Sequence, residues 1–488
     1  MRAVLSRQNL AEILGLSLFG MIAASIIGWG EDGLLITLSL LIYAVVAWNL
    51  LRQAGGFIVT PALLFFLFFT VFIYIVGLGY FIHNGEGAMW GSGRRNYTFY
   101  LALNGGMIFM ALGAMLTSGL ARFQPRAELR AFRRRHWIDT HNLPSDKLVL
   151  FLVAGGATLI TLLYVLVIRG GSIPLLTVLS AAGRGDIQEL ASASRAQFTR
   201  YGTGAGTYVY QGYIQQFYII ILPAVALMFG GKYLLHRKRM WQLGWIFFLL
   251  VAGFFLVMSL QRWPLMFFLM LNYLLIAGFH SRVKLSHAGS FLAMIIGLFG
   301  VITYIRGISN LGSVLIGIKE RIFYVAVEIF YSLFEMFPRH YPFWGGNAIM
   351  TDLAGVLPGP GSSFARWLFD HFYRVNGNGT APTLFWGEMY VDFGLPGVWV
   401  GALLSGVAMQ MIYIYFIRGN KSLNSLVIYV IFTMSMGELA ISNPVTVVFQ
   451  FGIVTMLLLL LMMNTLSWLL STTPFTPAPA PVVSGGQP

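Results

Sequence analysis

The carboxylates most suggestive of chemistry are Glu388 and Asp392, four residues apart in the stretch GNGTAPTLFWGEMYVDFGLPG, 377–397. A loop ends at the Thr-Ala-Pro turn, 380–382, because the residue before proline is pushed out of helical geometry and proline suits a first helical turn. Both carboxylates then share one helical face at the outer end of an apolar span, where ionisable groups are costly and by default functional. We expect Glu388 to act as general base for a hydroxyl, and an ion pair with a neighbouring helix is the alternative.

A second candidate base, His371, lies among aromatic residues in FARWLFDHFYRVNGNGTAPT, residues 364–383. Arg366, Asp370 and Arg374 recur here every four residues, so they share one face of a short helix. Interleaved aromatic rings and guanidinium groups suit sugars, whose C–H faces stack on rings, and phosphates. An aromatic belt at the membrane interface is the alternative interpretation.

Arginine dominates the cations expected on the outer side of the membrane, where it supplies 12 of 13 basic residues. A guanidinium grips phosphate bidentately and never loses its charge, so this set predicts a site for lipid-linked pyrophosphate. Salt bridges within the same loops are the alternative, and Arg262, at an outer turn, either belongs to the site or snorkels. The residues predicted to bind substrate are Arg195, Arg200, Arg262, Arg366, Arg374, Tyr208 and Tyr213.

The elements that must position these residues are membrane helices. The chain has 488 residues, of which 57% are hydrophobic and 10% charged, far too little charge for a soluble protein of this size. The absence of cysteine excludes disulfides and thiolate chemistry. Apolar runs of about 17–25 residues, enough to cross ~30 Å of hydrocarbon, predict twelve transmembrane helices. They are placed at 10–29, 33–51, 57–81, 98–120, 148–168, 206–229, 242–260, 264–279, 288–304, 393–417, 423–441 and 444–466.

The charge distribution orients these helices. Placing the N-terminus inside puts 18 of the 31 basic residues in short inward loops, so the net charge of +14 requires no nucleic acid partner. The fold class predicted is an all-α polytopic membrane protein with one transmembrane domain, 1–470, and a disordered cytoplasmic tail, 471–488. Two large outward loops, about 169–205 and 305–382, carry the candidate site. Within the second, residues 320–337 are expected to form an interfacial helix whose polar face carries Glu328 and Glu335.

This pattern resembles a known family. The run Gly-Thr-Ala-Pro-Thr, Gly-Glu, Tyr, Phe-Gly and Pro-Gly at 379–397 is similar to that of the Wzy-type O-antigen polymerases, which join oligosaccharide repeat units in bacterial envelopes. Twelve spans and two arginine-bearing outward loops also match. So does an Arg followed eleven positions later by Gly, at Arg195 with Gly206 and at Arg366 with Gly377. The resemblance covers the whole topology, although its specific motif spans only about twenty residues.

The resemblance implies a GT-C-like glycosyltransferase of the bacterial inner membrane, with its active site facing the periplasm. Such an enzyme transfers a growing glycan from undecaprenyl pyrophosphate to a sugar hydroxyl of the next lipid-linked unit of lipopolysaccharide. Expected partners are that lipid-linked oligosaccharide, membrane lipids, and chain-length regulator and flippase proteins. No cofactor is expected, and the lack of metal-ligand spacing in the outward loops predicts metal-independent chemistry.

Three alternatives remain open from the sequence. An O-antigen ligase would differ only in its acceptor. A lipid-glycan flippase or transporter would more often show two comparable halves and a site at the membrane midplane. A non-catalytic assembly scaffold is the third. A product ladder of lengthened chains is the observation that separates a polymerase from these alternatives.

Overall fold

The computed structural model describes most of the chain between residues 30 and 472. The described residues are 30–57, 59–86, 92–139, 144–168, 173–180, 215–258, 262–280, 297–298, 300, 312, 316, 324–356, 364–373, 384–450 and 452–472. They are helical throughout, with no strand in these ranges and a single isolated parallel bridge between Ile138 and Ser422.

Ten of the twelve predicted spans coincide with described helices. Nine helical stretches of 18 to 34 residues among the described residues are long and apolar enough to cross a membrane, and α20 is a shorter apolar helix. These are the lengths and compositions of an all-α polytopic membrane protein. The predicted spans 10–29 and, apart from three residues, 288–304 lie outside the described residues. The helices of the transmembrane region are α2 (Gly30–Ala54), α3 (Pro61–Phe69), η1 (Thr70–Tyr74), α4 (Ile75–Ile82), α5 (Tyr97–Leu120), α7 (Pro144–Leu163), η2 (Tyr164–Ile168), η3 (Phe217–Ile221), α11 (Leu222–His236), α12 (Arg239–Met258), α13 (Arg262–His280), α19 (Phe385–Arg418), α20 (Leu423–Glu438), η5 (Thr446–Gln450) and α21 (Ile453–Thr472).

Local sequence explains where several helices begin. Thr60 accepts a hydrogen bond from the Leu63 amide at 3.3 Å, and Pro61 occupies the first turn, where its missing N–H costs nothing. Asn96 caps α5 in the same way through the Phe99 amide at 3.0 Å. Capping side chains of this kind satisfy amides that an apolar surrounding would otherwise leave unpaired.

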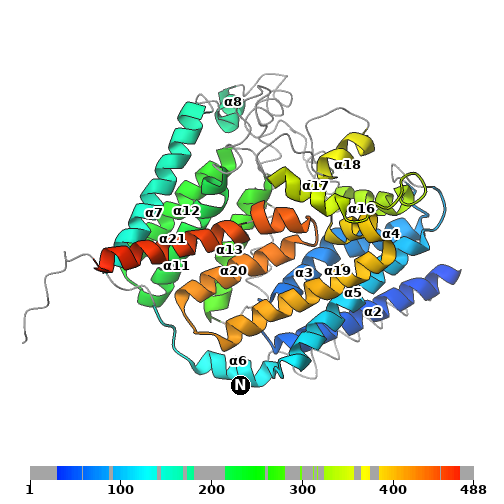
Figure 1. The fold of residues 1–488 in the computed structure, drawn as a ribbon, viewed down its shortest axis with the longest axis horizontal. Helices are drawn as coiled ribbons and strands as arrows, with labels where there is room; N and C mark the ends of the chain where they lie inside the picture. Colours follow the sequence, from blue (N-terminus) through cyan, green and yellow to red (C-terminus); the bar gives the residue numbers. More distant parts are fainter. Residues whose placement is uncertain are drawn as a thin grey trace, which may run out of the picture.

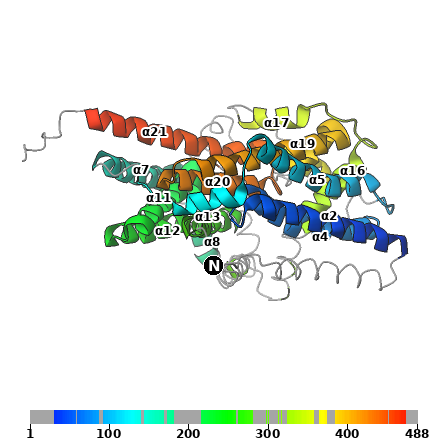
Figure 2. The same ribbon diagram turned by 90° about the horizontal axis from the view of Figure 1, so that it is seen from below.

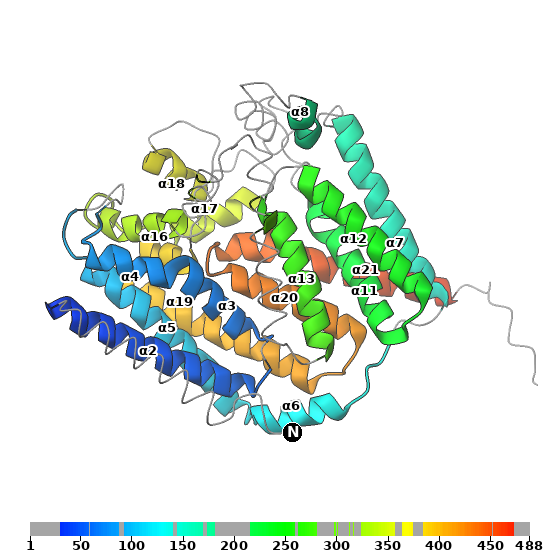
Figure 3. The ribbon, with the colours of Figure 1, turned by 180° about the vertical axis from the view of Figure 1, so that it is seen from behind.

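Five shorter helices lie at the two ends of the bundle. They are α6 (Pro125–Arg134), α8 (Pro174–Ser180), α16 (Val325–Met336), α17 (Asn347–Val356) and α18 (Phe364–Tyr373). The basic helix α6 lies at one end, and α8, α16, α17 and α18 lie at the opposite end (Figures 1 and 3). The described parts of both predicted outward loops therefore gather at the end away from α6, which agrees with the charge-based topology.

The transmembrane helices form two groups joined by α20 and α13. Helices α7, α11 and α12 lie on one side and α2, α4 and α5 on the other, in Figure 1 and in the view from below in Figure 2. At the α6 end, ion pairs connect the groups to the α6 region. Asp139 accepts from Lys232 at 3.0 Å and lies 2.7 Å from the His236 ring. Arg418 makes two 2.7 Å hydrogen bonds to Glu128 of α6.

Helix α16 corrects one expectation. The sequence predicted an interfacial helix with Glu328 and Glu335 on a face towards the polar side, but Glu335 is only 2% exposed. Its carboxylate accepts from Arg339 at 2.6 Å and from Asn96 at 2.7 Å. Because these donors compensate the buried charge, the face that carries Glu335 packs against the protein.

Candidate active site formed by α16–α19

The candidate site begins with a break in α19. Gly394 has φ 67° and ψ −158°, a conformation open essentially to glycine alone. The first segment folds back on the second, since a Cβ added to Gly397 would lie 2.4 Å from the Met389 carbonyl oxygen. Glu388 and Asp392 belong to this first segment, before the break. The sequence placed the span at 393–417, so its start was predicted correctly, whereas the fold-back was not.

The broken helix receives replacement hydrogen bonds from the loop after α16. Pro396 has no N–H, so the carbonyl of Asp392 loses its partner four residues on. The Gly345 amide donates to that carbonyl at 3.0 Å, and the Trp344 amide donates to the Val391 carbonyl at 3.0 Å. The loop 341–346 is thereby fixed against the first segment of α19 by backbone bonds.

Asp392 positions α17. Its two carboxylate oxygens accept hydrogen bonds from the amides of Ala348, at 2.9 Å, and Ile349, at 3.3 Å, in the first turn of that helix. A carboxylate at a helix N-terminus satisfies unpaired amides and interacts favourably with the helix dipole. Asp392 is 2% exposed, so this interaction is shielded from water. We conclude that Asp392 holds structure and does not face a substrate.

Asp352 of α17 connects three more elements. It is 4% exposed, and its Oδ1 accepts the Phe364 amide at the start of α18 at 2.7 Å. Its Oδ2 accepts from the Asn443 side chain, whose own oxygen accepts the Thr446 amide at 2.6 Å. One buried carboxylate therefore joins α17, α18 and the start of η5. Sequence analysis considered Asp352 only as a salt-bridge partner, and it missed Asn443.

Glu388 forms a side-chain hydrogen bond with Asp352. Glu388 is fully buried, at 0% exposure, so the pair lies away from water. Burial raises the pKa of Asp352, although hydrogen bonds from Glu388 and from the Phe364 and Ala365 amides oppose that rise. The two side chains therefore interact directly inside the protein.

His371 lies on an aromatic cluster formed by α18 and the loop after α16. Its ring stacks on Trp367, with centroids 4.1 Å apart, and meets Tyr341 edge-on at 6.0 Å. Trp367 packs in turn against Trp344 at 4.8 Å and against Phe364 at 5.7 Å. These rings pack into one aromatic cluster between α18 and the loop after α16.

One hydrogen bond sets the proton position on His371. Its Nδ1 lies 2.8 Å from the Trp367 carbonyl oxygen, one turn earlier in α18. A carbonyl only accepts, so Nδ1 carries the proton, and in the neutral ring Nε2 has a free lone pair. The ring is half-buried, and Arg366 on the same helix is exposed. The ring can therefore act as a proton acceptor, and Arg366 supplies a cation on the same helix.

The predicted site residues fall into three groups. Arg366, His371 and Glu388 are described, and the first two lie on α18, five residues apart and therefore on different faces of that helix. Glu388 lies in the interior and is connected to the start of α18 through Asp352. Arg262 begins α13, with only its backbone described. Outside the described residues lie Arg195, Arg200, Arg374, Tyr208 and Tyr213.

A further buried carboxylate lies on α20. Glu438 is 0% exposed and accepts from the indole N–H of Trp263 at 3.0 Å. This bond joins α20 to α13, which is a structural role.

Among the described residues, no group of three or more His, Asp or Glu side chains has an arrangement for a metal ion, and metal-independent chemistry stays a prediction. A groove of about 470 Å³ lies at the α6 end of the described structure, away from this site. Comparison with protein-family models, with curated proteins and with solved structures finds no match.

Proposed function

We propose that this protein is a membrane glycosyltransferase that polymerises lipid-pyrophosphate-linked oligosaccharide units at the end of the bundle carrying α16–α18. The observation that carries the proposal is the His371 ring, whose Nδ1 is held by the Trp367 carbonyl and whose face stacks on Trp367, on the helix that also carries the exposed Arg366. The resemblance of residues 379–397 to repeat-unit polymerases, and the placement of both predicted outward loops at this end, support it.

The chemistry requires charge neutralisation and a base. Pyrophosphate leaves with developing negative charge, which preorganised guanidinium groups stabilise in the transition state. Arg366 is the described candidate, and Arg195, Arg200, Arg262 and Arg374 are its expected companions. His371 Nε2 takes the proton from the attacking sugar hydroxyl as that oxygen bonds to the anomeric carbon and the bond to pyrophosphate breaks.

The aromatic cluster supplies a surface for the sugar. Ring faces accept the C–H faces of a pyranose. The half-buried Trp367 and Tyr341 border the His371 ring and so lie where an acceptor sugar would approach it. A sugar held there places its hydroxyl near Nε2, which lowers the barrier by orientation.

Glu388 takes a positioning role in this proposal. Its full burial and its bond to Asp352 remove it from a hydroxyl of a bulky glycan. Through Asp352 it holds the Phe364 amide at the start of the helix that carries Arg366 and His371. Glu388 therefore acts on the reaction through α18.

The test uses the purified full-length protein with lipid-pyrophosphate-linked repeat units in liposomes. A ladder of lengthened glycans on the lipid carrier is the result expected of a polymerase. Transfer of the glycan only to added lipid A–core acceptor would instead identify a ligase. Movement of unmodified units across the bilayer, without any ladder, would identify a flippase. If the protein neither lengthens nor moves any unit, the remaining alternative is a non-catalytic assembly scaffold.

A further inference from the structure

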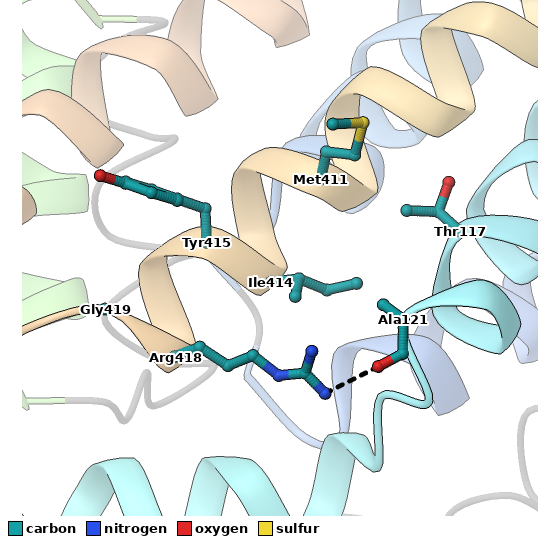
Figure 4. A pocket seen from close by; sticks show the side chains of 7 residues that line it. All are labelled: Thr117, Ala121, Met411, Ile414, Tyr415, Arg418 and Gly419. Atoms are coloured by element: carbon teal, nitrogen blue, oxygen red, sulfur yellow. Dashed lines mark hydrogen bonds between the residues drawn. The ribbon is translucent and has the colours of Figure 1, made fainter.

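A second surface, at the α6 end, is shaped by the way α5 and α19 cross. A Cβ added to Gly113 would lie 2.1 Å from the Leu403 carbonyl oxygen, and one added to Gly406 would lie 2.0 Å from that of Met110. The two helices therefore touch backbone to backbone at these glycines. Beyond this point, towards α6, their facing side chains are Thr117, Ala121 and Ile414 together with the long Arg418, and a groove opens between the helices (Figure 4).

The groove is apolar and opens on the lipid-facing side of both helices. Its lining includes Met411 and Tyr415, which are 58% and 82% exposed, and Leu120 beside it is 87% exposed. The hydroxyl of Thr117 donates to the Gly113 carbonyl at 2.9 Å, so this hydroxyl needs no acceptor from a molecule bound in the groove. A hydrocarbon chain fits such a surface within a bilayer.

The polar end of the groove is strongly basic. Six arginines but only two acidic residues occur between residues 120 and 139. Both acids are engaged, since Glu128 pairs with Arg418 and Asp139 pairs with Lys232 and His236. The positive charge of this segment is therefore not neutralised by its own carboxylates.

Carbonyl groups at the ends of α5 and α19, beside the groove, accept hydrogen bonds from arginines. Arg418 donates to the Ala121 carbonyl at 2.9 Å, and Arg135 donates to the Gly419 carbonyl at 2.9 Å. These bonds offset the negative ends of the α5 and α19 dipoles. Arg122, which follows the lining residue Ala121 in the chain, and Arg126, in the first turn of α6, are both exposed and carry the positive charge that can attract an anion.

We propose that this groove binds an anionic phospholipid, with an acyl chain between α5 and α19 and the headgroup phosphate against Arg122 and Arg126. Charge complementarity selects the occupant, because a zwitterionic lipid gains far less from two unneutralised arginines. The site is separate from the candidate active site, since α6 and α16–α18 lie at opposite ends of the bundle (Figure 1).

The test is native mass spectrometry of the full-length protein with phosphatidylglycerol or phosphatidylcholine. Wild type should retain phosphatidylglycerol preferentially, and the double variant R122Q/R126Q should bind it about tenfold more weakly. The matched control K238Q/R239Q removes the same charge at the exposed α11–α12 turn and should leave binding unchanged. Ala121→Trp, which fills the groove, should also weaken binding, and Met411→Trp at the exposed rim replaces it if that variant does not fold.

Three results would overturn the proposal. Equal binding of the two lipids would show that charge does not select the occupant. An equal loss in both double variants would mean that general surface charge attracts the lipid. Unchanged binding in the groove-filled variants, or a second copy cross-linked through Met411, would show that the groove holds no lipid chain.

Discussion

The carboxyl groups of Asp352 and Glu388 are hydrogen-bonded to each other in the buried junction of α17 and the first segment of α19. Asp352 also accepts the Phe364 amide at 2.7 Å, so this pair fixes the start of α18. The helix that carries Arg366 and His371 is thus fixed at its start by this buried pair of side chains.

Substitutions at Glu388 distinguish a positioning role from direct base catalysis. Glu388→Gln should keep near-normal abundance and polymer length, because its amide can still donate to Asp352. Glu388→Ala should lower stability by about 1–3 kcal/mol, because it leaves a buried group without its partner. Abundance in the membrane and glycan length are measured together. Normal abundance of Glu388→Gln with only single repeat units would instead make Glu388 the base.

Asp352→Asn should reduce thermal stability even though asparagine and aspartate have nearly the same shape. An amide nitrogen in place of Oδ2 cannot accept from Asn443, whose oxygen is already engaged by the Thr446 amide. The orphaned donor should cost about 1–3 kcal/mol, seen as a lower melting temperature in detergent. Thr351→Val, at a half-buried neighbour on α17, is the control, and equal melting temperatures for the two variants would contradict the proposed junction.

Gly394→Ala should disrupt the fold-back of α19. At φ 67° and ψ −158° a side chain is strained, and its Cβ would lie 3.3 Å from the Phe343 ring. The expected cost is about 1–3 kcal/mol, with loss of glycan polymer as Asp392 and Glu388 shift. Gly79→Ala is the control, since a Cβ there meets nothing within 4 Å. Full activity of Gly394→Ala would show that the break does not position the site.

The Glu128–Arg418 pair at the α6 end predicts a pH dependence. Hydrogen bonds from Arg418 lower the pKa of Glu128 below its ordinary value of 4.5. The pair therefore stabilises the folded state fully above that value, and the contribution is lost as pH falls through the lowered pKa. Glu128→Gln should cost about 1 kcal/mol at pH 7, and the difference from wild type should vanish in acid. A difference that does not shrink as pH falls through the lowered pKa of Glu128 would contradict the ion-pair account.

The length of the apolar runs predicted the spans, because a segment must be long and apolar enough to cross the hydrocarbon of a bilayer. It also located the start of the span after Gly394, where composition changes. It could not predict which way the face with Glu335 points, because spacing fixes which residues share a face and not its direction. The Asn96 amide that compensates Glu335 lies 239 positions away.

The sequence predicted which residue types would lie at the candidate site but not their geometry. Arg366 and His371 were expected on one short helix, and α18 carries both. The Asp352 carboxylate accepts the Phe364 amide twelve positions away, and no local pattern reports such a capping bond. For Glu388 the alternative to catalysis was an ion pair with a neighbouring helix, whereas the described structure places the Asp352 carboxyl beside it.

The most direct test of the account is the rate of glycan polymerisation by His371→Asn. Asparagine keeps a donor for the Trp367 carbonyl and removes the Nε2 base, so the fold is retained while the rate should fall about 10²–10⁴-fold. His340→Asn, at an exposed position between α16 and α17, is the control and should polymerise at the wild-type rate. A polymerisation rate in His371→Asn equal to that of wild type would contradict the assignment of His371 as the base.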